Sequence, residues 1–421
     1  MAVKSSKKNA FYAQSGGVTA VINSTAAGLI EEARKQGITV YAGLNGIIGA
    51  LKENLIDTTK ESTKDIYNLR HTPGGAFGSC RYKLKSLKEN SLEYERLIEV
   101  FKAHNISYFF YNGGGDSHDT VHKVSQISKI MGYPLTCIGI PKTVDNDIPL
   151  TDTCPGFGSV AKYISTSVRE VGYDLRSMSA SSTKIFVLEV MGRHAGWIAA
   201  SAGLAAEKAG EAPHVILFPE IVFNEKKFLA RVDSCVKKHG SCAIVVSEGL
   251  QNKKNAFLSD VGCVDAFGHV QLGGVAPVVA KLIKHELGYK YHWAVADYLQ
   301  RSARHLASKV DLEQAYATGK AAVTYAVAGK NDIMVSIKRK SNKPYRWGIS
   351  CVDLKDVANV EKKMPRNFIT PDGFHITPVC RRYLSPLIQG EDPPPFKNGL
   401  PQFVKLKNKL VKKKLKDHFK L

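Results

Sequence analysis

The chain has 421 residues, of which 44% are hydrophobic and 23% are charged. This length predicts two or three domains. The proportions of hydrophobic and charged residues are those of a globular chain, which excludes disordered and collagen-like proteins. No stretch reaches the ~18 consecutive apolar residues of a membrane helix, and the start has no signal-peptide core. We therefore expect a cytoplasmic protein with no membrane contact.

The formal net charge is +21, of which +13 lies in residues 330–421. Such a charge suits nucleic acid, an anionic surface or an acidic small substrate. The 8 cysteines include no CxxC pair and no Cys/His spacing that suits zinc. We interpret them as reduced thiols.

The first half of the chain alternates strands with glycine-rich turns. Residues 9–14 predict a strand that ends in Ser15-Gly16-Gly17, and residues 18–36 predict a helix that Gly37 ends. Residues 106–111 form a second apolar run before segment 112–117, and a helix is expected from about Asp119. Residues 135–140 predict another buried strand, followed by the polar segment 141–147.

The second half repeats this pattern. Residues 185–190 lead into segment 191–197, and residues 243–246 lead into segment 247–249. The alternation predicts an α/β fold of two doubly wound, parallel-sheet, Rossmann-like lobes. Because each polar segment follows a strand, we expect the active site at the carboxyl edges of the sheets, in the cleft between the lobes.

The glycines at 16 and 17 precede a predicted helix, whose first N–H groups can bind an anion. A structural tight turn explains them equally well. No GxxxxGK[ST] pattern occurs in the chain, which excludes a Walker-type phosphate loop.

Segment 113–117 places three glycines before Asp116 at a strand end, where the backbone is open to close approach by a ligand. A carboxylate in a phosphate pocket indicates either an intervening metal ion or the exclusion of a larger ligand. The alternative is that Asp116 caps the next helix.

Segment 141–147 carries Asp145 and Asp147 beside Lys142. Two acids at i and i+2 allow one to bind magnesium while the other acts as a base, and the lysine can bind phosphate oxygens. A solvated acidic turn is the alternative.

These motifs together resemble the phosphofructokinase family over residues 9 to about 320. The segments that carry the resemblance occur in the family's order: 15–17, 113–117, 139–147, 189–193, 247–248, 268–274 and 298–301. The resemblance implies phosphoryl transfer to the 1-hydroxyl of fructose 6-phosphate. It also implies catalytic roles for Asp145, Lys142 and Asp116.

Asp116 and Lys142 stand where ATP users of the family generally have glycine and pyrophosphate users have Asp and Lys. A carboxylate at position 116 would crowd and repel the α-phosphate of ATP, while Lys142 can stabilise the smaller donor. The resemblance therefore implies pyrophosphate as the donor and a reversible reaction. The alternative is the ATP-dependent reaction.

The resemblance also implies roles for other residues. Asp145 is the base, Thr143 positions the sugar, and Asp147 is a partner of Mg²⁺. Gly16 and Arg81 bind the donor. The sugar phosphate site comprises Met191, Gly192, Arg193, Glu248, Tyr298 and Arg301 together with Thr143 and Asp145, and further phosphate contacts are expected from Lys184 and His269.

Two positions depart from the family's pattern. Gly115 stands where relatives carry a carboxylate associated with the metal, so Asp147, Asp116 or the donor must take over that coordination. Leu272 follows Gln271 where many ATP-dependent relatives have an arginine, and Arg301 is expected to supply that phosphate contact.

We expect residues 1–156 and 272–330 to form the lobe that binds the phosphoryl donor, and residues 157–271 the lobe that binds fructose 6-phosphate. Residues 331–421 form a C-terminal extension whose basic end is solvated. Relatives assemble as dimers or tetramers, and we expect a homodimer. The non-enzyme alternative is an anion or nucleic-acid binder acting through the basic tail, but RNP-like and zinc motifs are absent from the sequence, so we expect no specific nucleic acid.

Overall fold

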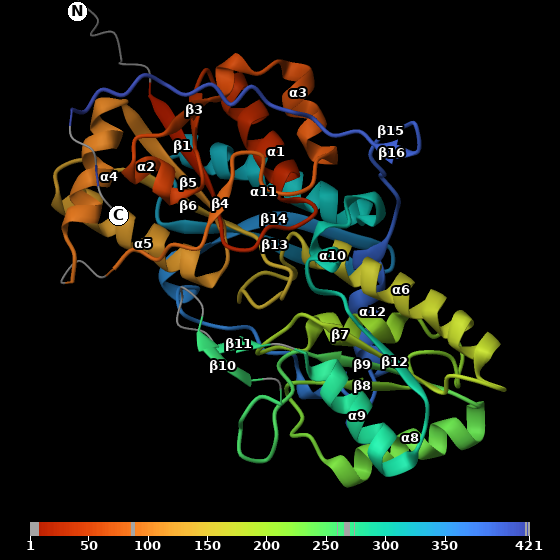
Figure 1. Ribbon diagram of the computed structural model, residues 1–421. Helices are drawn as coiled ribbons and strands as arrows, with labels where there is room; N and C mark the ends of the chain where they lie inside the picture. Colours follow the sequence, from red (N-terminus) through yellow and green to blue (C-terminus); the bar gives the residue numbers. More distant parts are fainter. Residues whose placement is uncertain are drawn as a thin grey trace, which may run out of the picture.

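The computed structural model describes residues 8–85, 89–258, 260–264, 270–272, 274–416 and 419, which form two α/β lobes (Figure 1). The first lobe has an 8-stranded sheet in the order β14-β13-β6-β5-β1-β2-β3, with β4 paired to β1. Its strands are β1 (Asn9–Ser15), β2 (Thr39–Gly43), β3 (Leu55–Asp57), β4 (Ser79–Cys80), β5 (Ile106–Gly113), β6 (Thr136–Pro141), β13 (Ile333–Asn342) and β14 (Tyr345–Asp353).

Helices cover both faces of this sheet. Successive side chains of β1 point to opposite faces of the sheet. Ala10 and Tyr12 pack in one apolar cluster, and Phe11 and Ala13 pack in the other. One face packs against α1 (Ile22–Lys35) and α11 (Lys309–Val327), and the other packs against α4 (Leu92–Ala103) and α5 (Gly115–Ile130). Burial on both sides explains why the parallel strands are almost continuously apolar.

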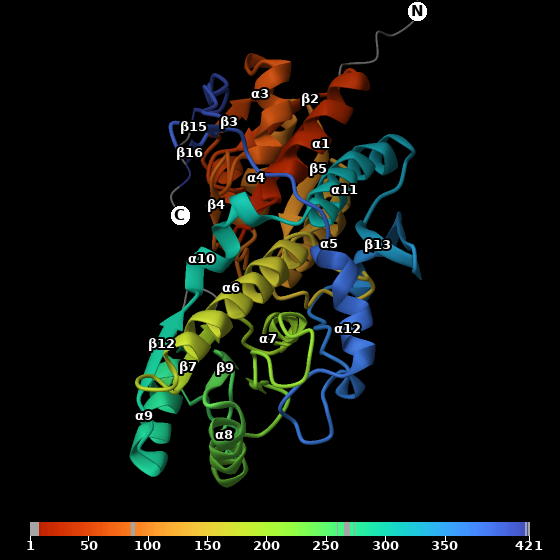
Figure 2. The same ribbon diagram turned by 90° about the vertical axis from the view of Figure 1, so that its right-hand side faces the viewer.

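The second lobe contains a 4-stranded parallel sheet in the order β12-β7-β9-β8. Its strands are β7 (Ile185–Val190), β8 (Val215–Leu217), β9 (Cys242–Ser247) and β12 (Tyr291–Val295). α6 (Phe157–Met178) and α7 (Trp197–Ser201) cover one face, and α8 (Glu225–His239) and α9 (Val275–Leu287) cover the other. Figure 2 shows α6 running along this lobe beneath the first.

The return to the first lobe comes later than the predicted boundary at residue 272. β12 pairs in parallel with β7, from Tyr291 opposite Ile185 to Val295 opposite Glu189, so it belongs to the second sheet. The apolar face of α9, which includes Val275 and Ile283, packs in the same cluster as β7. The chain leaves the second sheet only after β12, through α10 (Asp297–Ser302).

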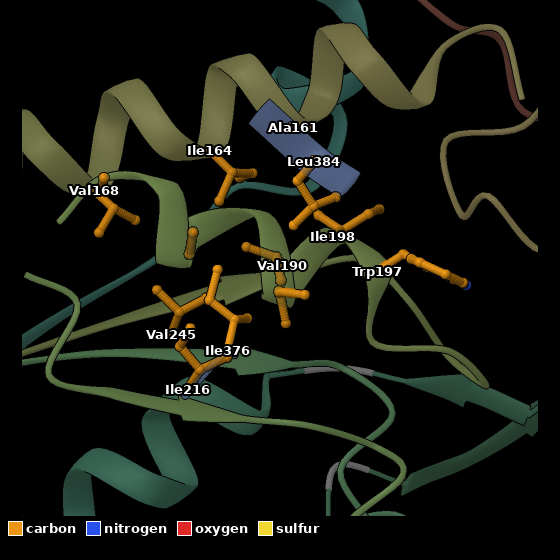
Figure 3. Packing of buried hydrophobic residues seen from close by; sticks show 14 of the residues in the cluster. Ala161, Ile164, Val168, Val190, Trp197, Ile198, Ile216, Val245, Ile376 and Leu384 are labelled. Atoms are coloured by element: carbon orange, nitrogen blue, oxygen red, sulfur yellow. The ribbon is translucent and has the colours of Figure 1, made fainter. Parts of the chain in front are cut away.

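The C-terminal residues are integrated into both lobes. β13 pairs in parallel with β6 and antiparallel with β14, which extends the first sheet. Ile376 and Leu384 pack into the core of the second lobe beside Ile164 and Val190 (Figure 3). Leu384 ends α12 (Pro378–Leu384). The extension is therefore part of each lobe's core.

The backbone of the basic tail lies along the first lobe, while its lysines from Lys405 to Lys416 are exposed, as expected for a solvated basic end. Residues 402–416 run in an extended path across the first lobe (Figure 1). The N–H of Asp57 donates to the Lys409 carbonyl at 2.9 Å, and the N–H of Val411 donates to the Leu55 carbonyl at 2.8 Å. The tail thus covers the exposed edge at β3, which would otherwise leave unpaired backbone groups.

Smaller elements complete the fold: α2 (Ile47–Leu51), α3 (Thr63–Asn68) and the antiparallel pairs β10 (Asp260–Val264) with β11 (Val270–Leu272) and β15 (Phe396–Lys397) with β16 (Leu400–Pro401). In the described part of the chain, no helix combines the length and apolar character needed to cross a bilayer.

Candidate active site

A cleft of about 1070 Å³ lies between the two lobes. Its walls are the segments that follow β1, β5 and β6 in the first lobe and β7, β9 and β12 in the second. Parallel strands bring their carboxyl ends to one edge, which explains why segments so far apart in sequence meet there. Most of the predicted site residues line it: Gly16, Arg81, Gly115, Asp116, Lys142, Thr143, Asp145, Asp147, Met191, Arg193, Glu248, Tyr298 and Arg301.

The loop after β6 carries the two predicted functional carboxylates. Its start is held by the N–H of Lys142, which donates to the Gly113 carbonyl at 3.1 Å. Thr143 Oγ1 accepts from the N–H of Asp145 at 3.1 Å. Between the carboxylates, Asn146 has φ 53°, a left-handed conformation that turns the backbone sharply. Asp145 and Asp147 both line the cleft as a result.

The electrostatics of this loop suit proton transfer near neutral pH. Burial, with repulsion from Asp147 and Glu248, raises the pKa of Asp145 to about 7. Burial also lowers the pKa of Lys142 to about 8, against the opposing effect of the two aspartates. A base with a pKa near the working pH is the arrangement that general-base catalysis requires.

Asp147 offers an oxygen suited to a cation. Its Oδ1 is buried and has no hydrogen-bond partner among the described residues, and burial raises the pKa of its carboxyl. The described part of the chain contains no group of three or more His, Cys, Asp or Glu side chains placed to hold a metal ion. Magnesium is commonly held by one or two carboxylates with substrate phosphates and water, so these residues fit it.

The turn after β1 contains Gly16 and Gly17, and cationic side chains lie close to its backbone. Gly16 has φ 70°, and its N–H donates to the Cys80 carbonyl at 2.9 Å. A Cβ on Gly16 would lie 3.5 Å from the amine of Lys142, and one on Gly17 would lie 2.6 Å from the guanidinium of Arg301. The missing Cβ of Gly17 therefore leaves room for the guanidinium of Arg301, whereas at Gly16 the left-handed backbone is the reason for a glycine.

Asp116 lies in the first turn of α5 and is paired with Lys83, which the sequence analysis missed. Lys83 Nζ donates to Asp116 Oδ1 at 2.8 Å, and both residues line the cleft. At Gly115, no atom of a described residue other than its chain neighbours and the backbone of its own helix lies within 4 Å of the place where a Cβ would stand. Among the described residues outside this turn, no side chain fills the place of the carboxylate that the family resemblance leads us to expect at position 115. A lysine within a lysine-rich segment gives no sequence signal of this pairing.

The second lobe contributes the opposite wall. Gly192 has φ 123°, and its N–H donates to Glu248 Oε1 at 3.2 Å. The guanidinium carbon of Arg301 lies 3.6 Å from the ring centre of Tyr298. Arg193 Nε is buried and unpaired among the described residues. These cationic groups suit a phosphate ester.

One predicted residue, Lys184, does not line the cleft, and another lies outside the described residues. Lys184 precedes β7, at the end of the strand opposite Met191, and its amine donates to the Ser179 carbonyl. His269 lies outside the described residues. The side chains of Gln271 and Leu272 are likewise not described.

A segment of the C-terminal extension also lines the cleft, and the sequence analysis missed it. Asn359, Val360, Glu361 and Lys363 all face the same space as Asp147. No motif marks this segment, because its position depends on the packing of the extension onto both lobes.

Comparison with known proteins agrees with this geometry. The phosphofructokinase family model matches residues 9–326. The chain belongs to the phosphofructokinase family. It is 63% identical over 415 residues to the pyrophosphate–fructose 6-phosphate 1-phosphotransferase of Methylococcus capsulatus, covering 98% of this chain and 99% of that protein.

Solved structures of phosphofructokinases share the fold. The crystal structure of the pyrophosphate-dependent phosphofructokinase from Marinobacter aquaeolei superposes with a TM-score of 0.90 at 62% identity, covering 98% of this chain and all of that one. The ATP-dependent 6-phosphofructokinase of Amycolatopsis methanolica is 29% identical over 284 residues, 65% of this chain and 58% of its own length. The similarity to pyrophosphate-dependent family members is therefore much the greater.

Proposed function

We propose that this protein transfers a phosphoryl group reversibly from pyrophosphate to the 1-hydroxyl of fructose 6-phosphate, forming fructose 1,6-bisphosphate and phosphate. The observation that carries the proposal is the pair Asp116 and Lys142 in one cleft with the buried carboxylate of Asp145. The full-length similarity to pyrophosphate-dependent phosphotransferases supports it.

Each lobe has a separate role in this proposal. The first lobe binds the donor through Gly16, Arg81 and Lys142. The second lobe, with α10, binds the sugar phosphate through the cationic groups of Arg193 and Arg301, together with Met191, Gly192, Glu248, Tyr298 and the loop residue Thr143. Phosphoryl transfer depends mainly on positioning and on neutralising charge, which this set provides.

Asp145 removes the proton from the 1-hydroxyl as the hydroxyl attacks the terminal phosphorus of pyrophosphate. The P–O bond to the leaving phosphate breaks, and Lys142 stabilises the negative charge that develops there. In the reverse direction Asp145 returns the proton to the sugar oxygen.

A divalent cation is general in phosphotransferases of this family, and we propose Mg²⁺ held by Asp147 with Asp145 nearby. When bound, Mg²⁺ supplies charge neutralisation and alignment of the phosphate oxygens. We further propose that the enzyme works as a cytoplasmic homodimer, in which Lys184 and His269 contribute further phosphate contacts.

Asp116 disfavours ATP. In pyrophosphate, the space beyond the second phosphorus is empty, whereas in ATP it holds the α-phosphate and the nucleoside. A carboxylate at the start of α5, with Lys83 bound to it, would meet that third phosphate.

The test is the initial rate of fructose 1,6-bisphosphate formation with Mg²⁺ and equal concentrations of either pyrophosphate or ATP, for the wild type and Asp145→Ala. Activity with pyrophosphate alone, lost in the variant, is the expected result. Activity with ATP alone would overturn the donor assignment, and activity with neither would overturn the reaction.

A further inference from the structure

Lys362 lies behind the loop that carries the two aspartates, on a segment beyond the residues that the family model matches. Its amine donates to Asn146 Oδ1 at 3.0 Å, to the Thr151 carbonyl at 3.1 Å and to the Asp152 carbonyl at 3.2 Å. An ammonium group has three N–H donors, so these contacts use all of them. All three donors of the side chain are therefore used on Asn146 and on the two carbonyl groups that follow the loop.

The backbone of Lys362 is tied to the same region. Its N–H donates to the Asp147 carbonyl at 2.6 Å, and its carbonyl accepts from Trp197 Nε1 at 3.2 Å. The segment is thus anchored to the loop on one side and to the second lobe on the other. These two hydrogen bonds hold the backbone of Lys362 in place relative to both the loop and the second lobe.

Asn146 connects Lys362 to the two aspartates of the loop. It is fully buried and left-handed, and it separates Asp145 from Asp147. Its Oδ1 also accepts from the N–H of Cys154 at 3.0 Å, and its Nδ2 donates to the hydroxyl of Tyr383 at 3.1 Å. Every contact holds the side chain in one place, which offsets the unfavourable backbone conformation.

A buried ammonium at this position is expensive to keep. Burial lowers the pKa of Lys362, because taking the charge out of water disfavours it. A methionine of similar length would fill the same space without that cost. Such a methionine could make none of the three hydrogen bonds of the Lys362 amine, and it is these bonds that tie the side chain to the loop.

We propose that Lys362 is a positioning residue for phosphoryl transfer, holding Asn146 so that the carboxylates of Asp145 and Asp147 face the cleft together. The inference rests on the proposed function, because it assigns those carboxylates to base and cation binding. It places a determinant of catalysis in the C-terminal extension.

The first test compares Lys362→Met with Lys355→Met as the matched control. Lys355 is exposed, belongs to the same C-terminal region and pairs only with Asp353 at 3.6 Å in the described structure. We expect Lys362→Met to lower kcat about 10²-fold, the loss typical of misplaced reacting groups, with little change in KM for either substrate. Lys355→Met is expected to retain wild-type kcat.

A double-mutant cycle tests the route through Asn146. Asn146→Gly permits the left-handed backbone but removes the side chain that Lys362 holds. In that background, Lys362→Met is expected to lower kcat much less than in the wild type, because coupled residues are not additive. Equal fold losses in both backgrounds would overturn the inference.

Tyr383→Phe gives a second, milder variant should Lys362→Met fail to fold. It removes the hydroxyl that accepts from Asn146 Nδ2, and we expect a smaller fall in kcat with unchanged KM values. Wild-type kcat in both variants would overturn the inference. If the wild type itself does not use pyrophosphate, the proposed function fails instead, so the two failures are distinguishable.

Discussion

Lys83 Nζ lies 2.8 Å from Asp116 Oδ1, joining the segment after β4 to the first turn of α5 across one end of the cleft. Both side chains are about two-fifths exposed, at 43% and 39%. An ion pair so exposed contributes little to stability, typically 0–1 kcal/mol. We therefore expect this ion pair to matter for the shape and charge of that end of the cleft, where the phosphoryl donor is proposed to bind.

Asp116→Gly is expected to let the enzyme use ATP. The substitution removes the carboxylate that would repel a third phosphate and releases Lys83 from its partner. We expect measurable activity with ATP and a higher KM for pyrophosphate, about tenfold for a loss of ~1.4 kcal/mol. Steady-state kinetics with both donors measures this. Unchanged donor preference would show that Asp116 does not select the donor.

Asp145→Asn is expected to lower kcat about 10²- to 10⁴-fold, the usual contribution of a general base. The same change should stabilise the fold above pH 5. Burial raises the pKa of Asp145 to about 7, so the folded protein binds a proton more tightly than the unfolded chain does. Its contribution to stability is therefore present below the unfolded pKa and lost as the pH rises through about 7.

Thermal melting at pH 8 measures this effect. We expect Asp145→Asn to melt above the wild type, by an amount equivalent to on the order of 2 kcal/mol. At pH 4 the difference should be much smaller, because the carboxyl is then protonated in the folded state and about half protonated in the unfolded chain, where the pKa of Asp is about 3.9. A lower melting temperature at pH 8 would contradict burial as the cause of the raised pKa.

The pH dependence of kcat/KM for fructose 6-phosphate is expected to be bell-shaped. Activity should rise as Asp145, with a pKa of about 7, loses its proton. It should fall as Lys142, with a pKa of about 8, loses its charge and its hold on phosphate. Rates from pH 5 to 10 give the profile. Lys142→Met should remove the alkaline limb, and a persistent limb would assign it to another group.

Glu53→Gln is expected to loosen the C-terminal tail without affecting the chemistry. The buried Glu53 carboxylate accepts from the N–H of Lys414 at 2.6 Å and from His104 Nε2 at 2.7 Å. Burial tends to raise the pKa of Glu53, but these hydrogen bonds outweigh it and the pKa is lowered. Its stabilisation is therefore present above the unfolded pKa and lost as the pH falls.

Thermal melting at pH 7 should show a loss of about 1–3 kcal/mol for Glu53→Gln, the cost of weakened hydrogen bonds to a buried charge. Glu95→Gln, on the exposed face of α4, is the control and should melt with the wild type. Limited proteolysis should cut the tail faster in Glu53→Gln. An unchanged melting temperature would mean that the tail adds no stability through Glu53.

Much of the fold and the site was predictable from local pattern. The apolar runs that end in polar or glycine-rich segments predicted β1, β5, β6, β7 and β9. The parallel arrangement then predicted that Asp116 and Asp145 lie at the edge of one sheet and face Met191 of the other sheet across the cleft. The family followed from seven segments in order, and the donor followed from Asp116 and Lys142. The return to the first lobe was predicted too early, because α9 and β12 have the same local pattern in either lobe.

Side-chain pairing and long-range docking were decided by the tertiary structure. Lys83 and Lys362 stand in lysine-containing segments where nothing in the spacing distinguishes them from solvated residues. Their partners, Asp116 and Asn146, lie 33 and 216 positions away.

The sequence by itself determined which strands form and which polar segments follow them, because periodicity and turn chemistry act over a few residues. Only the tertiary structure decided that the extension joins both cores and that its lysine holds the aspartate loop. Contacts between segments hundreds of residues apart depend on how whole layers pack, and a local pattern carries no record of that packing.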